Sequence, residues 1–266
     1  MATAFEPVVF KYRVPEEPLS EFVELFWYWR GYDQSYSEER VLPTGTVELV
    51  INLASGTWRA GISGPKSRFF VIERRAQDEL LGIHFKVGGA FPFLGFPIGE
   101  LHNMDITLGD LWGEKKMGEL LGLVHDAATV EMKFQVLEKW LVLAADCPLQ
   151  HRPAVSYAVR EFRRDPGLLR SVELAERAGF SQRRFIEIFR DEVGLTPKLF
   201  CRVQRFQQVI GKVNNRNTID WADLAVSLGY YDQAHFIHDF QEFSGLTPTE
   251  YLSSRTDHLN HVKICE

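Results

Sequence analysis

The side chains best suited to contacting nucleic acid bases lie in two short segments, residues 182–190 and 233–238. Arg183 can donate two hydrogen bonds to guanine, Glu187 can accept one from cytosine, and Ile186 can touch the methyl group of thymine. Gln233 can pair with adenine through its amide. The candidates that we place on outward faces are Gln182, Arg183, Ile186, Glu187 and Arg190, then Gln233, Ala234, His235 and His238. An ordinary solvated helix surface could carry the same residues, so the elements that hold them must decide.

An internal repeat contains both segments. Residues 174–180 (Leu-Ala-Glu-Arg-Ala-Gly-Phe) align with residues 224–230 (Leu-Ala-Val-Ser-Leu-Gly-Tyr) at an offset of 50. One extra residue in the second copy then gives an offset of 51, at which Gly-Leu-Thr-Pro recurs at 194–197 and 245–248. Between these motifs, Gln182, Phe185, Ile186 and Phe189 match Gln233, Phe236, Ile237 and Phe240. The repeat predicts two copies of one supersecondary unit.

Each copy reads as two helices joined by a tight turn. Gly179 suits the positive φ of a helix end, and Ser181 is a good N-cap for the helix that follows. Thr196 and Pro197 suit the start of another helix. A small residue, Ala175, followed by glycine four residues later is the spacing of a helix-turn-helix. We therefore predict helix-turn-helix units over 171–194 and 219–245 and a linker helix over 197–213; the alternative is a pair of helical hairpins without a nucleic acid role.

The first half of the chain is typical of a β-rich domain. Residues 47–53, 69–72 and 80–85 are rich in β-branched and aromatic residues and are bounded by Gly and Pro turns. Residues 115–145 carry apolar residues at helical spacing. Asp-Cys-Pro at 146–148 then suggests a linker. We predict an α+β chain with a sensing or dimerising domain at 1–148 and an all-helical domain, without strands, at 149–266.

Charge is divided unevenly along the 266 residues, whose formal net charge is −6. Residues 151–216 hold 14 Lys and Arg against 7 Asp and Glu, whereas residues 217–266 hold 2 against 8. We expect the first helix-turn-helix unit to contribute most of the affinity for an anionic partner. The second unit is expected to recognise bases weakly or to help bind RNA polymerase. Three widely spaced cysteines, no leader-like N-terminus and no long apolar run predict a cytoplasmic protein without membrane contact.

Residues 153–252 resemble the DNA-binding domain of the AraC/XylS family of bacterial transcription regulators. The resemblance implies two helix-turn-helix units that enter successive major grooves of double-stranded DNA. It assigns base reading to Arg183, Ile186 and Glu187, and to Gln233, Ala234, His235 and His238. The residues that carry the resemblance are Leu174-Ala175, Gly179-Phe180-Ser181, Arg184-Phe185, Phe189, Gly194 to Pro197, Arg205, Ile219, Leu224-Ala225, Gly229-Tyr230, Phe236, Phe240, Gly245 to Pro248 and Tyr251.

Four further residues are candidates for contacts with phosphate or for a scaffold role: Ser181, Arg184, Arg202 and Arg205. The family resemblance favours a structural role for Arg205. The first half also resembles an uncharacterised N-terminal domain of many AraC-type regulators, through Leu42 to Gly45, Glu48 to Val50, Gly82 to Ala90 and Asp110 to Gly113. That resemblance implies a cupin-like barrel followed by helices and brings no ligand with it.

A small-molecule effector could bind this first domain. Trp27 and Trp58 could line a pocket, and Glu48 or His84 could supply a polar anchor, although core packing also explains the tryptophans. We expect His258, His261 and Cys265 to lie in a solvated tail, so no metal or other cofactor is predicted.

Catalytic motifs are missing from the sequence: it holds no Gly-rich phosphate loop, nucleophile elbow or HExxH. Fusion to a DNA-repair methyltransferase would require an activated cysteine, usually in Pro-Cys-His-Arg, which is also missing. We therefore expect no enzyme. Two alternatives remain open for the first domain, which could sense a protein partner or serve only to form a homodimer.

Overall fold

The computed structural model describes residues 8–31, 38–54, 60–73, 78–145, 148–164, 171–214, 219–256 and 258–264. Three positions singled out in the sequence fall outside these residues: Trp58, Cys265 and the Asp146-Cys147 part of the expected linker.

A six-stranded antiparallel sheet forms the centre of the first half. Its strands run in the order β1 (Val9–Arg13), β2 (Val23–Arg30), β7 (Glu79–Phe85), β4 (Glu48–Asn52), β5 (Ala60–Ser63) and β8 (Asp105–Thr107). Alternate residues such as Phe26, Leu49 and Ile83 are completely buried on one face. That face packs under the helices of this half, where Phe26 meets Phe134.

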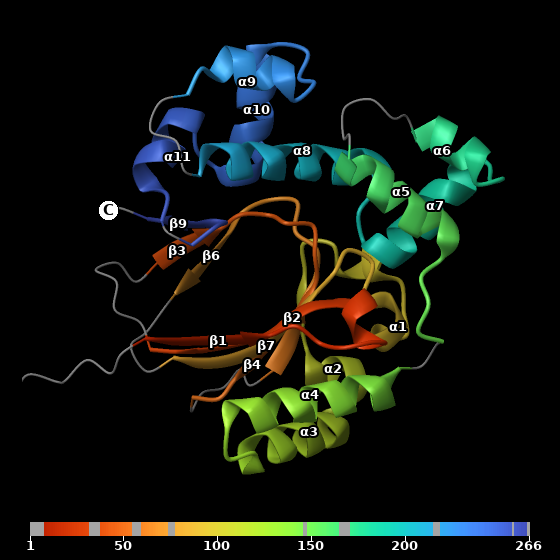
Figure 1. The fold of residues 1–266 in the computed structure, drawn as a ribbon, viewed down its shortest axis with the longest axis vertical. Coiled ribbons are helices and arrows are strands. Elements are labelled where there is room, and N and C mark those ends of the chain that lie inside the picture. Colours follow the sequence, from red (N-terminus) through yellow and green to blue (C-terminus); the bar gives the residue numbers. More distant parts are fainter. Residues whose placement is uncertain are drawn as a thin grey trace, which may run out of the picture.

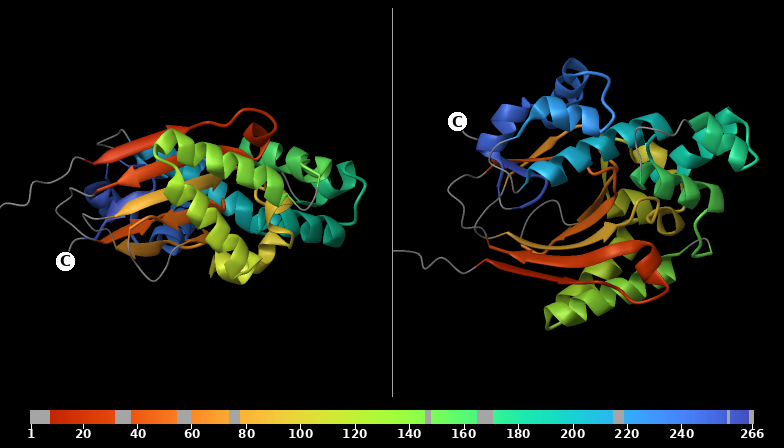
Figure 2. Two further views of the ribbon diagram at one scale, coloured as in Figure 1. Left: turned by 90° about the horizontal axis from the view of Figure 1, so that it is seen from below. Right: turned by 45° about the horizontal axis from the view of Figure 1, so that its top comes forward.

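Helices α2 (Leu108–Trp112), α3 (Glu114–Asp126) and α4 (Val130–Ala144) lie along this buried face (Figures 1 and 2). The other helical segments of this half are η1 (Leu19–Glu21), α1 (Phe91–Leu94) and η2 (Ile98–Leu101). The apolar periodicity of residues 115–145 thus belongs to two helices, because Thr129 caps α4 by accepting from the backbone N–H of Met132.

A second sheet of three strands faces the first one (Figure 1) and pairs a strand near the C-terminus with two strands of the first half. Its order is β6 (Phe70–Glu73), β3 (Glu38–Val41) and β9 (His261–Lys263). The expectation of a strand-free second half is therefore wrong, and so is a solvated position for His261, whereas His258 is exposed as expected. Val262 is fully buried, and the ring Nδ1 of His261 lies 2.8 Å from a carboxylate oxygen of Glu39. A three-residue strand whose partner lies over 200 positions away leaves no local pattern to recognise.

The other regular elements among the described residues of the second half are helices. They are α5 (Pro153–Arg164), α6 (Ser171–Arg177), α7 (Gln182–Val193), α8 (Pro197–Val213), α9 (Trp221–Ser227), α10 (Gln233–Ser244) and α11 (Pro248–Ser254). Helix α8 occupies the range expected of the linker helix and runs between the first unit (α6 and α7) and the second unit (α9 and α10) (Figure 1). The expected order, a sheet-rich half followed by a helical half, is confirmed.

Equivalent caps make the two units alike. Ser181 and Asp232 cap the N-termini of α7 and α10, and Gly194 and Gly245 end these helices at positive φ. The two halves also share packing, since Leu42 and Val87 of the first half belong to the same buried cluster as Phe200 of α8. Among the described residues, no helix combines the length and apolar character needed to span a bilayer.

Candidate nucleic-acid interface

Helix α7 presents a polar face because its apolar residues point into the helical core. Phe185, Ile188, Phe189 and Val193 are buried. The opposite side exposes Gln182, Arg183, Glu187 and Arg190, while Ile186 is half-buried. The side chain of Arg183 is 92% exposed, so nothing in the fold requires an arginine at that position.

Glu187 forms ion pairs with both arginines at the start of α7, Arg183 and Arg184. Its carboxylate lies 3.2 Å from Nε of Arg183 and 3.4 Å from Nη1 of Arg184. The hydrogen bond from Arg183, with that from Arg184, holds the pKa of Glu187 below its ordinary value. An anionic ligand would have to compete with Glu187 for both arginines, so Glu187 weakens their attraction to such a ligand.

Arg190, at the other end of α7, lies against the first half of the chain. A Cβ atom built on Gly99 would be 2.8 Å from Cγ of Arg190, which shows how closely the arginine stem approaches η2. Arg190 is therefore further from the free N-terminal end of α7 than the other candidates, and its stem has a packing role.

Helix α10 repeats the arrangement with different chemistry. Asp232 accepts from the backbone N–H of His235 at 2.7 Å, and Phe236, Phe240 and Phe243 are buried beneath the helix. The exposed face carries Gln233, Ala234, His235 and His238. Two histidines and an amide thus occupy the surface that carries arginines in the first unit.

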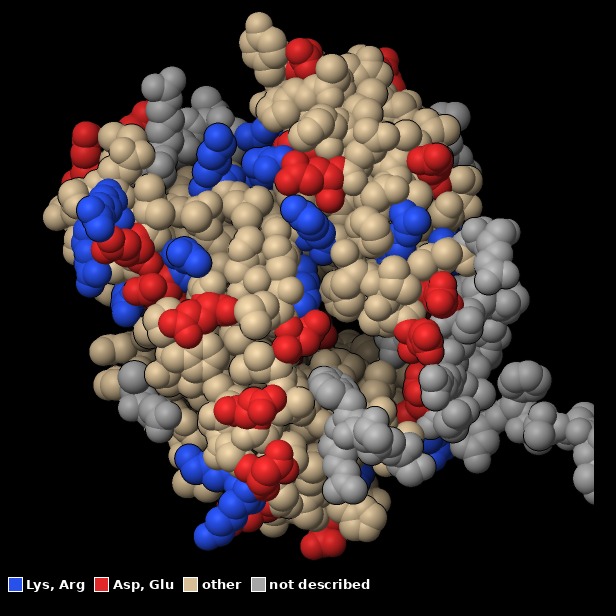
Figure 3. All heavy atoms as spheres, turned by 180° about the vertical axis from the view of Figure 1, so that it is seen from behind, with Lys and Arg blue, Asp and Glu red and all other residues tan. Residues whose placement is uncertain are grey.

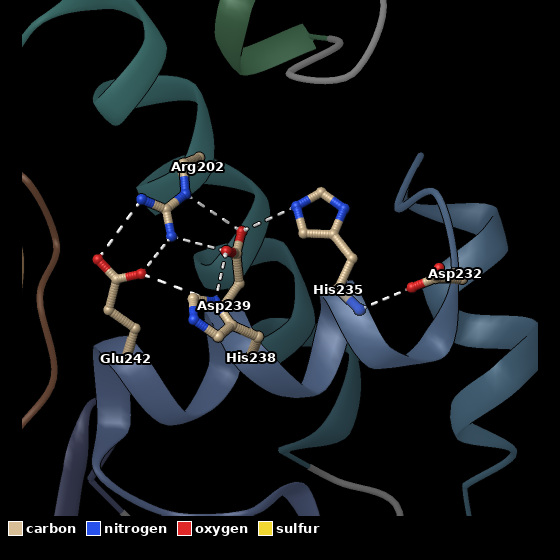
Figure 4. Close-up of polar contacts among 6 residues, drawn as sticks. All are labelled: Arg202, Asp232, His235, His238, Asp239 and Glu242. Atoms are coloured by element: carbon tan, nitrogen blue, oxygen red, sulfur yellow. Dashed lines mark hydrogen bonds and ion pairs between the residues drawn. The ribbon is translucent and has the colours of Figure 1, made fainter.

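A charged network behind this face joins α10 to α8 (Figure 4). Nη2 of Arg202 donates to Asp239 at 2.7 Å and to Glu242 at 2.5 Å, and its guanidinium lies over the ring of Phe243. The Asp239 side chain is only 2% exposed. Burial alone would lower the pKa of Arg202, but hydrogen bonds and charges from Asp239 and Glu242 raise it well above its ordinary value. Arg202 therefore serves as a scaffold within the helical half.

The other phosphate or scaffold candidates lie in different surroundings. The guanidinium of Arg205 stacks on the ring of Tyr230, 4.9 Å from its centroid, which also indicates a scaffold role. Ser181 caps α7, where its side chain accepts from the backbone N–H of Arg184. Both Ser181 and Arg184 are exposed at the start of α7, where backbone N–H groups favour a phosphate.

Figure 3 shows one face of the whole surface. On this face Lys and Arg side chains gather mainly in the upper half, over the helical elements, and are interspersed with Asp and Glu.

Three potential metal ligands lie on α10 within 4.8 Å of one another: His238, Asp239 and Glu242. Both carboxylates already bind Arg202 (Figure 4), so a cation there would have to displace the guanidinium. The cluster is explained by the link between α8 and α10.

The effector-site candidates of the first half share one sheet face. Glu48 and His84 are paired in register on β4 and β7, with 2.7 Å between a carboxylate oxygen and Nδ1. The ring of Trp27 on β2 covers Gly82, where a Cβ would be 2.2 Å from the indole. These side chains alternate with residues buried under α4, so they project toward the second sheet and the helical half. Trp58 lies outside the described residues.

The environment of His84 combines opposing influences. Burial lowers the pKa of the imidazole, but the hydrogen bond and the charge of Glu48 outweigh it, so that the pKa stands above its ordinary value. The pair thus supplies a partly buried polar group on this sheet face, where Glu24 and Arg163 also act on His84.

One contact between the halves is not marked by any sequence motif. The Glu192 side chain, at the end of α7 and 1% exposed, lies 2.9 Å from Nδ1 of His151. The His151 ring stacks on Phe22 of the first half. The sequence places Glu192 on the buried side of a helix, which indicates that it needs a polar partner. The sequence does not show that this partner is His151.

Comparison with known proteins bears on both halves. Residues 174–254 match the family model described as a helix-turn-helix domain, and residues 11–107 match a domain of unknown function, DUF6597. This chain carries an AraC-type helix-turn-helix domain. The resemblance to the AraC type, which was drawn over residues 153–252, is confirmed where the family model matches, from residue 174 onward.

The AraC-type domain also has a curated relative. An uncharacterized HTH-type transcriptional regulator of Haemophilus influenzae is 32% identical over 82 residues, which are 31% of this chain and 27% of the relative. The matched region thus spans about a quarter of that protein.

Solved structures with some similarity include two bacterial proteins. The C-terminal domain of AraT, a response regulator from Geobacillus stearothermophilus, is 18% identical, with 40% of this chain and 88% of that chain covered and a TM-score of 0.36. ToxT from Vibrio cholerae is 10% identical, with 93% and 97% covered and a TM-score of 0.40.

Proposed function

We propose that the protein is a sequence-specific DNA-binding regulator of transcription whose two units read successive major grooves of one duplex. The observation that carries this proposal is the pair of exposed helix faces, on α7 and α10, presented by repeated units on either side of α8. A major groove is wide enough to admit an α-helix, and side chains at the start of such a helix can reach base edges.

The exposed residues fit base reading better than they fit packing. Arg183 can bind guanine through two hydrogen bonds, and Gln233 can bind adenine. Ile186, Glu187, Ala234, His235 and His238 occupy neighbouring positions on the same two faces. Neither Arg183 nor Gln233 is needed to hold its helix in place, since both side chains point into solvent.

The first unit supplies most of the binding energy in this proposal. Arg183, Arg184 and the positive charge of residues 151–216 favour an anionic duplex, whereas Asp232, Asp239 and Glu242 accompany the second recognition helix. Electrostatic attraction to phosphate is the main sequence-independent part of DNA affinity. The second unit then adds selectivity, or contacts RNA polymerase.

The test begins with the selection of duplexes from a random pool by the full-length chain. Binding of the enriched duplex is then measured for Arg183→Ala and Gln233→Ala. Loss of a base contact costs about 1–3 kcal/mol, which is roughly 5- to 150-fold in affinity, and Arg183→Ala should lose more than Gln233→Ala.

Lys139→Ala provides a matched control, because Lys139 is exposed on α4, in the first half. It removes a positive charge without touching a recognition helix, so affinity should change little. An equal or larger loss for Gln233→Ala would refute the dominance of the first unit. Failure to enrich any sequence would refute the proposed function itself.

The first half is proposed to bind a small-molecule effector at the sheet face that carries Trp27, Glu48 and His84. An indole beside a partly buried ion pair offers an apolar surface with one polar anchor, which is the usual composition of a ligand site. Thermal-shift screening of the full chain with metabolites tests this step. A stabilising compound whose effect disappears in Trp27→Ala supports the site, whereas an effect that persists in this variant places the compound elsewhere.

A further inference from the structure

One loop of the first half touches both helix-turn-helix units at equivalent positions. This loop, residues 64–69, joins β5 to β6 and is defined here as the bracket loop. Pro65 lies near its start and Phe69 at its end. They contact Gly194 and Gly245, the residues that end α7 and α10 and that correspond to each other in the internal repeat.

The first contact leaves no room for a side chain. Gly194 has a φ of +90°, and a Cβ atom built there would lie 2.4 Å from Cγ of Pro65 and 2.8 Å from Cγ2 of Ile98. Ordinary carbon contacts are about 3.5–4.0 Å, so the end of α7 is seated directly on the bracket loop.

The second contact is equally close and includes hydrogen bonds. Gly245 has a φ of +68°, and a Cβ atom there would lie 2.4 Å from the ring of Phe69. The backbone N–H of Phe69 donates to the carbonyl of Phe243 at 2.9 Å. Arg40 of β3 stacks on Phe69 and donates to the carbonyl of Gly245 at 3.1 Å. The end of α10 is thus bound to the first half.

The bracket loop is itself held firmly. Its central residues Lys66 and Ser67 are buried, and both are paired with the segment that follows η2. Lys66 lies 2.7 Å from the carboxylate of Asp105, and the backbone N–H of Ser67 donates to Asn103 at 2.8 Å. Asn103 also donates its backbone N–H to the carbonyl of Pro65. A loop with its buried polar groups satisfied in this way is rigid.

We propose that the bracket loop positions the two recognition helices relative to each other, with Pro65 and Phe69 as the positioning residues. Helix α8 alone joins the two units along the chain, and the bracket loop adds a second connection between the C-terminal ends of α7 and α10. The spacing of two DNA-reading helices decides which half-site separation fits. This inference rests on the proposed function. It means that contacts with the first half fix the positions of both units.

The test compares three glycine-to-alanine substitutions that impose a similar backbone strain. Gly179, Gly194 and Gly245 all have positive φ, so alanine strains each of them by a similar amount. Only Gly194→Ala and Gly245→Ala also press on the bracket loop. Gly179→Ala is the matched control, because no atom lies within 4 Å of a Cβ built at Gly179.

Pulsed electron spin resonance measures the distance between spin labels at Gln182→Cys and Gln233→Cys, equivalent exposed positions of α7 and α10. The labelled background carries Cys147→Ser and Cys265→Ser. Cys201 stays, because it is buried and burial raises the pKa of its thiol to about 12. A control protein whose only cysteine is Cys201 is treated with the spin label and should remain unlabelled.

We expect Gly194→Ala and Gly245→Ala to shift or broaden the distance distribution by on the order of 1–2 Å, the overlap that must be relieved to restore ordinary contacts. Gly179→Ala should leave it unchanged. Adding Phe69→Ala to Gly245→Ala removes the clashing ring, so the mean distance should return toward its original value, but the distribution should stay broad because α10 has lost its contact with the bracket loop. A merely destabilising effect of Gly245→Ala would not be rescued by deleting a second side chain.

The same variants are compared on the enriched duplex and on a duplex with only one half-site. The proposal predicts a loss of about tenfold or more, confined to the two-half-site duplex. Identical distances for Gly245→Ala and Gly179→Ala would overturn it. If Gly245→Ala does not fold, Phe69→Ala is measured alone, and an unchanged distribution then overturns the proposal. The distance measurement needs no DNA, so it stands apart from a failure of the proposed function.

Discussion

Removal of the Arg202 guanidinium should destabilise the second unit more than the loss of any exposed arginine. Arg202→Met keeps the length of the side chain and its contact with Phe243, but it leaves Asp239 without its main cation. The Asp239 side chain is 2% exposed and cannot recover hydration, whereas Glu242, at 35%, can.

The expected loss of stability in Arg202→Met follows from the burial of Asp239. Breaking a buried ion pair by removing one partner costs about 3–5 kcal/mol, and the 24% exposure of Arg202 favours the lower end. For a protein of this size, each kcal/mol lowers the unfolding midpoint by about 2–4 °C, so we expect a fall of roughly 6–12 °C.

A double-mutant cycle with Asp239→Leu, followed by thermal unfolding, isolates the pair. Arg202→Met with Asp239→Leu should recover much of the loss, with a coupling of about 0.5–3 kcal/mol, because no uncompensated buried charge remains. Arg184→Met is the control, since Arg184 and its partner Glu187 are both exposed. Equal midpoints for Arg202→Met and Arg184→Met would refute the assignment of Arg202 to the scaffold.

Two further predictions concern the remaining charged groups. Glu187→Gln frees Arg183 and Arg184, so binding to non-specific DNA should strengthen and the slope of log K against log salt should steepen by about one; an unchanged slope would contradict this. Glu48→Gln removes the partner that raises the pKa of His84. The stability that the wild type gains over this variant should therefore be complete below about pH 6.5 and disappear as pH rises through the raised pKa, as measured by chemical unfolding from pH 5.5 to 8.5. A difference that is constant over this range would rule out the ion pair as its source.

The sequence predicted the elements of the helical half well because each is specified locally. Apolar spacing and the caps at Ser181, Gly194 and Thr196 define where α7 begins and ends and where α8 begins, and the internal repeat supplies the same information twice. The exposed faces follow from the same periodicity, since burial of Phe185 and Phe189 leaves Arg183 and Glu187 outside.

Contacts between distant segments could not be predicted in this way. Strand β9 consists of three residues whose ladder partners lie in β3, and a one-sequence pattern contains no trace of that pairing. The scaffold role of Arg202 depends on Asp239, 37 residues away. The contacts of Pro65 and Phe69 with the two units likewise depend on how the halves pack.

The central claim is most directly tested by the specificity of the full-length chain for DNA. A duplex enriched from a random pool should contain two preferred segments about one helical turn, roughly 10 base pairs, apart. At physiological salt it should bind at least about 10³-fold more tightly than a scrambled duplex of equal length. Equal affinity for the enriched and scrambled duplexes would contradict the assignment of α7 and α10 as helices that read DNA.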